Sequence, residues 1–143
     1  MSARGGDVRT PPHSIEAEQA VLGGLLLDSA AWDNVADVLR ADDFYRPDHR
    51  IIFEAIGFLA TQGQPSDAVT VSEHLARSSK LVEAGGLAYL GALARDTPTA
   101  ANVRAYADIV RERSLLRQLL RAGTDIAASV FNNEGETARE LLE

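Results

Sequence analysis

The C-terminal third of the chain contains an unusually long stretch without helix-breaking residues. Between Thr99 and Phe131 there is no proline and only one glycine, Gly123. This stretch predicts one helix of about thirty residues, roughly 48 Å long at about 1.5 Å per residue. A compact domain of 143 residues is only about 35 to 40 Å across. We therefore expect the long helix to extend beyond a globular head.

The apolar residues of this helix follow two seams that are rotated around its axis, a pattern typical of a helix with two helical neighbours. The first seam consists of Tyr106, Ile109, Leu116 and Leu120, and the second of Leu115, Leu119, Ala122 and Ile126. Asn132 to Glu136 read as a turn, and Thr137 with Glu140 forms a capping box that opens another helix. Residues 98–143 are thus predicted to be a helical hairpin whose second arm, from 137, is truncated at 143.

The preceding residues, 14–97, predict an all-α globular head of five or six helices. Ser14 can cap the first helix, about 15–27. Inside that helix Gly23 and Gly24 each cost about 1 kcal/mol relative to alanine, which indicates that another backbone passes close by. A second helix is expected at about 29–40, capped by Ser29, with a buried stripe of Trp32, Val35, Ala36 and Leu39. Further helices are expected from Asp48 to Gly63, which would be the C′ glycine, from a Thr70–Glu73 capping box, and at 85–97. Residues 1–13 are expected to be a disordered tail.

Composition and motifs exclude most kinds of catalytic site. The chain has no cysteine, which removes disulfides, thiolate chemistry and zinc fingers. It has no Walker A phosphate loop, no nucleophile elbow and no zinc-protease helix. The three histidines lie in separate segments, so we expect no metal, no bound cofactor and no catalytic residue. No apolar run is long enough to span a membrane or to direct export, so a cytoplasmic location is expected.

Two acidic motifs resemble catalytic groups but have simpler interpretations. Asp42 and Asp43 could be paired carboxylates, although adjacent acids after a helix are more typical of a solvated turn and cap. Asp48 and His49 could form part of a proton relay, although Asp48 is more simply the N-cap of the following helix.

Charge is distributed unevenly along the chain. Fourteen Lys and Arg residues against 21 Asp and Glu give a net charge of −7, which does not favour nucleic acid as the main ligand. Five arginines nevertheless gather on the long helix: Arg104, Arg111, Arg113, Arg117 and Arg121. This ridge could bind single-stranded DNA or an acidic partner. Alternatively, the arginines flank the apolar seams and pair with Asp108, Glu112 or Asp125.

Several segments together resemble the N-terminal domain of the bacterial replicative helicase family, DnaB. They are PPHSIEAEQAVLGGLLLD at 11–28, DDFYRPDHRIIFEAI at 42–56, DAVTVSEHL at 67–75, GGLAYLGAL at 85–93 and PTAANVRAYADIVRERSLLRQLL at 98–120. The resemblance covers about 11–143 and preserves order and spacing. It implies an all-helical head and hairpin that form the collar of a ring-shaped hexamer. The family's motor domain, which uses ATP and Mg and moves 5′ to 3′ on single-stranded DNA, would lie elsewhere.

The resemblance also implies a non-enzymatic role in the primosome. In the family, hairpins of neighbouring domains pair, so Tyr106, Ile109, Leu115, Leu116 and Leu119 are candidates for the oligomer interface. The collar docks the C-terminal helicase-binding domain of primase. The positions that match the family's docking contacts are Glu16, Tyr89, Leu120 and Ile126, with Leu120 standing where isoleucine is familiar.

Overall fold

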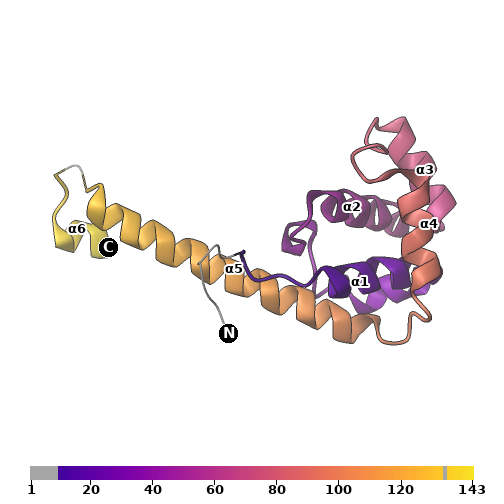
Figure 1. Ribbon diagram of the computed structural model, residues 1–143, viewed down its shortest axis with the longest axis horizontal. Coiled ribbons are helices and arrows are strands. Elements are labelled where there is room, and N and C mark those ends of the chain that lie inside the picture. The colour runs from indigo at the N-terminus through magenta and orange to yellow at the C-terminus, as the bar shows by residue number, and fades with distance from the viewer. Residues whose placement is uncertain (1–9, 134) are drawn as a thin grey trace. The chain divides into compact units, whose positions relative to one another are not determined.

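The computed structural model describes residues 10–133 and 135–143, and these residues form helices and turns without any strand (Figure 1). The predicted all-α class is therefore confirmed. Most of the predicted disordered tail, residues 1–9, lies outside the described residues. The elements are α1 (Ile15–Leu27), the 3-10 helices η1 (Ser29–Asn34) and η2 (Ala41–Asp43), α2 (Pro47–Thr61), α3 (Ala68–Arg77), α4 (Gly86–Asp96), α5 (Val103–Phe131) and α6 (Ala138–Leu142).

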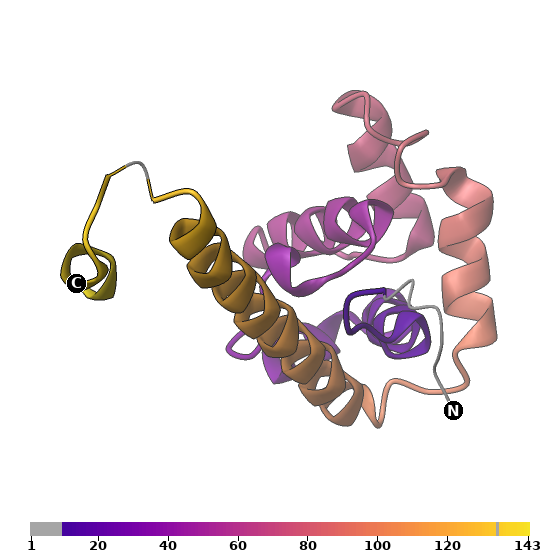
Figure 2. The same cartoon turned by 60° about the vertical axis from the view of Figure 1, so that its left-hand side comes forward.

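The described residues divide into two compact units, with α5 continuing from one into the other. His13–Ser114 form the first, which we call the head, and Leu115–Glu143 belong to the second. In the head, α1 packs against α2 and α4, and α3 packs against the same two helices (Figure 2).

Helix α1 is the central element of the head because its second half is apolar on every side. All six residues from Val21 to Leu26 are buried, as expected for a helix surrounded by others. Ser14 caps its first turn as predicted, since the Ser14 hydroxyl accepts a hydrogen bond from the Ala17 N–H at 3.2 Å.

The predicted close approach at the glycine pair is confirmed. A Cβ atom placed on Gly23 would lie 1.9 Å from Thr97 Oγ1 and 2.4 Å from the Leu93 carbonyl oxygen. One placed on Gly24 would lie 3.3 Å from a methyl group of Val103. The end of α4 and the start of α5 therefore approach α1 where it carries no side chain.

The predicted helix at 29–40 is wrong. Residues 29–34 form η1, and turns follow as far as Val38, because the segment is shaped by tertiary contacts rather than by helical propensity. Asp28 caps η1, whereas the Ser29 hydroxyl accepts a hydrogen bond from the Ser66 N–H at 3.1 Å. Of the predicted buried stripe, Val35 and Leu39 are buried, Trp32 is half-buried and Ala36 is exposed.

Two further helix starts differ from the prediction. Helix α2 begins at Pro47 with Arg46 as N-cap, because a proline fits the first helical position; Asp48 therefore lies in the first turn and is not the cap. Helix α3 begins at Ala68, since the Asp67 side chain accepts from the Thr70 N–H at 2.9 Å and takes the capping role assigned to Thr70. Gly63 follows the C-cap of α2 with φ 70°, as predicted.

Helix α5 starts at Val103, four residues later than predicted. A turn precedes it, in which the Thr99 hydroxyl accepts from the Ala101 N–H at 3.1 Å. In the head the helix buries Val103, Ala107, Val110 and Ser114. In the second unit a turn leads to α6, where the predicted Thr137–Glu140 capping box is confirmed.

Candidate functional site

A groove of about 360 Å³ opens on the head between α1, α4 and the start of α5. Its lining includes Glu16 and Gln19 from α1, Tyr89 and Asp96 from α4, and Tyr106 from α5. Glu16 is exposed, whereas Tyr89 is half-buried, so the tyrosine lies at the junction of groove and core. The arrangement combines carboxylates, an amide and two phenol rings on one surface, which suits recognition of a protein partner.

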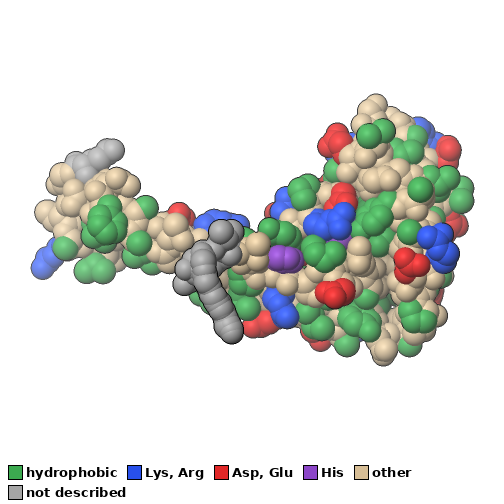
Figure 3. All heavy atoms as spheres, in the orientation of Figure 1, with side chains coloured by type: hydrophobic (Ala, Val, Ile, Leu, Met, Phe, Trp, Pro, Cys, Tyr) green, Lys and Arg blue, Asp and Glu red, His purple; other side chains and the backbone are tan. Residues whose placement is uncertain are grey.

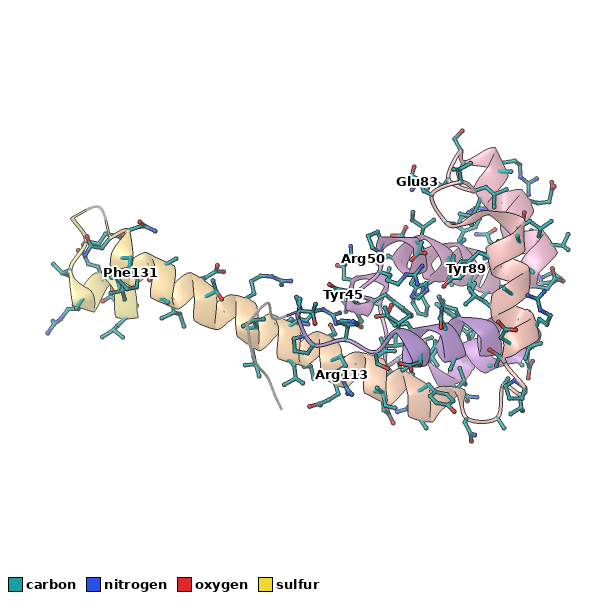
Figure 4. All side chains as sticks on the ribbon, viewed as in Figure 1. Tyr45, Arg50, Glu83, Tyr89, Arg113 and Phe131 are labelled. Carbon is teal, nitrogen blue, oxygen red and sulfur yellow. The ribbon has the colours of Figure 1, made fainter. Side chains whose placement is uncertain are left out.

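Three helices hold the Tyr89 hydroxyl in place. Tyr89 extends from α4 toward α1 and α2 (Figure 4). Its oxygen lies 2.7 Å from His49 Nε2 in the first turn of α2 and 3.2 Å from Gln19 Nε2 in α1. His49 is fully buried, and its ring is stacked parallel to the Tyr89 ring with centroids 6.0 Å apart.

The other side of His49 contacts a buried carboxylate. His49 Nδ1 lies 2.7 Å from Glu18 Oε1, and Glu18 is only 1% exposed. Glu18 Oε2 accepts a second hydrogen bond, 2.7 Å long, from the Tyr45 N–H. The chain Glu18–His49–Tyr89 therefore runs from the interior of the head to the groove, and its buried members are hydrogen-bonded, as buried polar groups require.

The guanidinium group of Arg46 lies over the ring of Tyr89. The Arg46 guanidinium carbon lies 5.5 Å from the centre of the Tyr89 ring, within the range of a cation–π contact. Arg46 also donates from Nε to Asp48 Oδ1 at 3.0 Å, and this hydrogen bond raises the pKa of Arg46 further above its usual value. The guanidinium is thereby kept charged and oriented beside the groove residue.

The structure brings together some of the predicted docking residues. Glu16 and Tyr89, which are distant in sequence, line the same groove. Tyr106, predicted at the oligomer interface, lines it as well. Leu120 and Ile126 belong to the second unit, where they are 52% and 67% exposed.

The residues predicted to form the oligomer interface differ in exposure. Ile109 is half-buried against the core of the head. Leu115 and Leu116 are each 38% exposed, and Leu119 is 69% exposed. Exposed hydrophobic side chains continue along the second unit as far as Phe131, at the end of α5 (Figures 3 and 4).

The arginine ridge is partly engaged in contacts within the protein. Arg104 bonds Asp108 at 3.5 Å, one of the pairs expected if the arginines are structural. Arg111 bonds Asp43 at 2.9 Å, and Arg117 donates to the Pro12 carbonyl oxygen at 2.8 Å. Arg113 is half-buried and Arg121 is exposed. These contacts favour the structural interpretation for Arg104, Arg111 and Arg117.

The interpretation of Asp42 and Asp43 as a solvated turn and cap is right for the cap and for Asp42, but wrong for the solvation of Asp43. Asp42 is exposed, but Asp43 is 3% exposed and accepts hydrogen bonds from the Arg40 N–H at 2.8 Å and the Ser114 hydroxyl at 2.7 Å. Sequence reasoning missed this anchor because Ser114 and Asp43 are brought together only by the fold.

Sequence reasoning also missed Glu18 and the role of His49. The available signal was Glu18 itself, an acid that lies three, four and seven residues before Val21, Leu22 and Leu25, on the same apolar face of α1. A charge at such a position needs a partner, and a histidine in the first turn of another helix is one.

Two features that other kinds of protein contain are absent from the described residues. Among residues 10–133 and 135–143, no helix is long and apolar enough to cross a membrane. Within the same part of the chain, no three His, Cys, Asp or Glu side chains are grouped so as to hold a metal ion.

Comparisons with known proteins agree with the fold. The family model described as the DnaB-like helicase N terminal domain matches residues 10–112. Replicative DNA helicase DnaB of Pasteurella multocida is 43% identical over 133 residues, and that of Geobacillus stearothermophilus is 51% identical over 128 residues. The matches cover 93% and 90% of this chain but only 28% of either relative.

Solved structures of DnaB-type helicases also match the fold of this chain. The crystal structure of the N-terminal domain of DnaB helicase from Mycobacterium tuberculosis superposes with a TM-score of 0.89 at 44% identity, and the match covers 93% of both chains. A structure of a DnaB-like replicative helicase and its interactions with primase matches with a TM-score of 0.72 at 25% identity, covering 82% of this chain and 28% of that one.

Proposed function

Because the chain belongs to the family of DnaB-like helicase N-terminal domains, we propose that it is the assembly and primase-docking domain of a replicative helicase. Its role in this proposal is to bind proteins and not to catalyse a reaction. ATP, Mg and most DNA contacts belong to a separate motor domain of the parent helicase, which acts in the cytoplasm. The chain spans about 28% of the length of its curated relatives, which leaves room for such a domain.

The observation that carries the docking proposal is the groove shared by Glu16 and Tyr89. Residues separated by more than seventy positions meet on one surface, which combines a carboxylate with a tyrosine fixed by buried hydrogen bonds. Aromatic residues held rigidly at a partly desolvated surface are typical anchors of protein interfaces. Primase is favoured as the partner because a related helicase of the same fold has been solved with its primase interactions.

The second unit supports the assembly role. Its exposed apolar side chains, Leu119, Leu120, Ile126, Val130 and Phe131, are each at least half exposed. Helices that leave so much apolar surface uncovered are stabilised by association. We propose that this surface pairs with a neighbouring chain in a hexameric collar, and that Leu120 and Ile126 also contact primase.

Docking is tested by titrating the chain with the C-terminal domain of the cognate primase. Calorimetry gives the dissociation constant, and light scattering on a sizing column gives the mass of the complex. Tyr89→Ala is expected to weaken binding about fivefold to tenfold, which corresponds to about 1 kcal/mol or more, while circular dichroism shows unchanged helicity. Val82→Ala, a truncation of a side chain that is 92% exposed outside the groove, serves as the control and should bind like the wild type. No binding by the wild-type chain, or an unchanged dissociation constant for Tyr89→Ala, would contradict the proposal.

A further inference from the structure

A direction for the hydrogen bonds around Tyr89 is assigned from the groups that can only donate or only accept, with His49 as the neutral tautomer that fits them. The Tyr45 N–H can only donate, so Glu18 Oε2 is an acceptor. The carboxylate likewise accepts the proton of His49 Nδ1, 2.7 Å away. In a neutral imidazole with its proton on Nδ1, Nε2 is an acceptor, and the Tyr89 hydroxyl donates to it at 2.7 Å.

The hydrogen bond from Gln19 agrees with this assignment of donors and acceptors. The Gln19 side-chain N–H donates to the Tyr89 oxygen at 3.2 Å. All four groups are then satisfied by one consistent pattern, in which the hydroxyl proton of Tyr89 is turned inward to His49. Gln19 occupies one lone pair of the Tyr89 oxygen, so a second lone pair of this groove-lining residue is used by neither Gln19 nor His49, and the two hydrogen bonds restrict rotation of the ring.

We propose that His49, oriented by Glu18, is a positioning residue for partner binding, because it holds the Tyr89 hydroxyl inward and so presents Tyr89 as a fixed hydrogen-bond acceptor in the groove. This inference rests on the proposed docking function and assigns a specificity device to the same site. His49 is fully buried and so does not touch the partner; it acts through the Tyr89 hydroxyl. The partner chemistry that matches is a side chain or backbone N–H that donates a hydrogen bond.

The pattern also explains why the network is built from a histidine. A leucine or phenylalanine at position 49 would fill the core, but the buried Glu18 carboxylate would lose its ring N–H donor. The Tyr89 hydroxyl would lose its acceptor at the same time. Stability and docking are therefore affected by different ends of the imidazole, which allows an experiment to separate them.

The test is a double-mutant cycle between His49 and the Tyr89 hydroxyl, with the primase C-terminal domain as the probe and its dissociation constant as the readout. Tyr89→Phe removes only the hydroxyl and is expected to weaken binding about threefold to tenfold. His49→Leu is expected to weaken it by a similar factor. In the Tyr89→Phe background, His49→Leu should produce no further loss, because the hydroxyl through which it acts is already absent.

His49→Gln provides a rescue variant. Its side-chain carbonyl oxygen can accept the Tyr89 hydroxyl proton, whereas its contact with Glu18 is changed, so we expect docking near the wild-type level with reduced thermal stability. A purely structural histidine would not separate the two measurements. Val82→Ala, which truncates an exposed side chain outside the groove and outside the network, is again the control and should bind within twofold of the wild type.

The outcomes distinguish this inference from the docking function on which it rests. If Tyr89→Ala weakens binding but Tyr89→Phe does not, the groove binds primase and the positioning role is refuted. The role is also refuted if His49→Leu weakens binding equally with and without the hydroxyl. If Tyr89→Ala binds like the wild type, the docking function itself fails. If His49→Leu does not fold, Tyr89→Phe and His49→Gln still decide the matter.

Discussion

Substituting Gly23 with alanine tests the packing at the centre of the head. The new Cβ would lie 1.9 Å from Thr97 Oγ1 and 2.4 Å from the Leu93 carbonyl oxygen, both far inside van der Waals contact. The Thr97 hydroxyl could rotate only by giving up its 2.9 Å hydrogen bond to the same carbonyl oxygen. That carbonyl is backbone of α4, so relief requires α1 and α4 to separate.

The magnitude follows from two opposing contributions. Overpacking of this kind costs about 3 kcal/mol or somewhat more where backbone must move, and alanine gains about 1 kcal/mol of helix propensity over glycine. We expect a net loss of about 2 kcal/mol. For a cooperative unit of about 100 residues, an unfolding entropy of about 2.1 cal/mol/K per residue converts this loss into a decrease in Tm of about 10 °C.

The assay is thermal and urea unfolding followed by circular dichroism. Gly91→Ala is the matched control, because Gly91 is also within a helix but a Cβ placed there meets nothing within 4 Å. It should be stabilised by up to about 1 kcal/mol. If Gly23→Ala is as stable as the wild type, or gains as much as Gly91→Ala, the reasoning about the close approach of α4 is refuted.

Two other predictions concern carboxylates in different settings. Asp43→Ala should lower the free energy of unfolding by about 2 to 3 kcal/mol, because the buried Ser114 hydroxyl loses its 2.7 Å acceptor, and a urea melt in which it matched the exposed Asp42→Ala would contradict this. In α6, the pKa of Glu140 is lowered below 4.5 by hydrogen bonds from Thr137. The larger effect comes from the Thr137 backbone N–H and the smaller one from its side chain. The capping contribution should therefore be complete above pH 4.5 and be lost as pH falls through the lowered pKa. The Thr137 amide resonance reports this titration by NMR, and a midpoint at or above 4.5 would show that the capping box does not form.

The sequence predicted those features that depend on neighbours along the chain. Ser14, Gly63 and the Thr137–Glu140 pair act within one helix turn, and their capping roles were confirmed. The Gly23 contact was predictable because two adjacent glycines inside an apolar helix have a known cost that packing must offset. The helix at 29–40 was wrong because Ser29 is held by Ser66, far along the chain.

The candidate site was only partly predictable for the same reason. Glu16 and Tyr89 could be named from the resemblance to a family, but their common groove is created by the packing of α1 against α4. The positions of Glu18 and His49 depend on the register between α1 and α2, which periodicity does not specify. A buried acid in an apolar helix is a usable signal, although its partner is identified only from the fold.

Helix α5 changes its thermodynamic character at Ser114. Up to that residue it buries Val103, Ala107 and Val110 in the head, so its folding is supported by the head's own core. Beyond it, large apolar side chains as far as Phe131, which is 87% exposed, are mostly open to solvent. Burying one such side chain is worth about 1.5 to 3 kcal/mol, so in the proposed assembly the helicity of this segment would be governed by mass action with the chain that covers it. One continuous helix would then combine a part with intrinsic stability and a part whose stability depends on concentration.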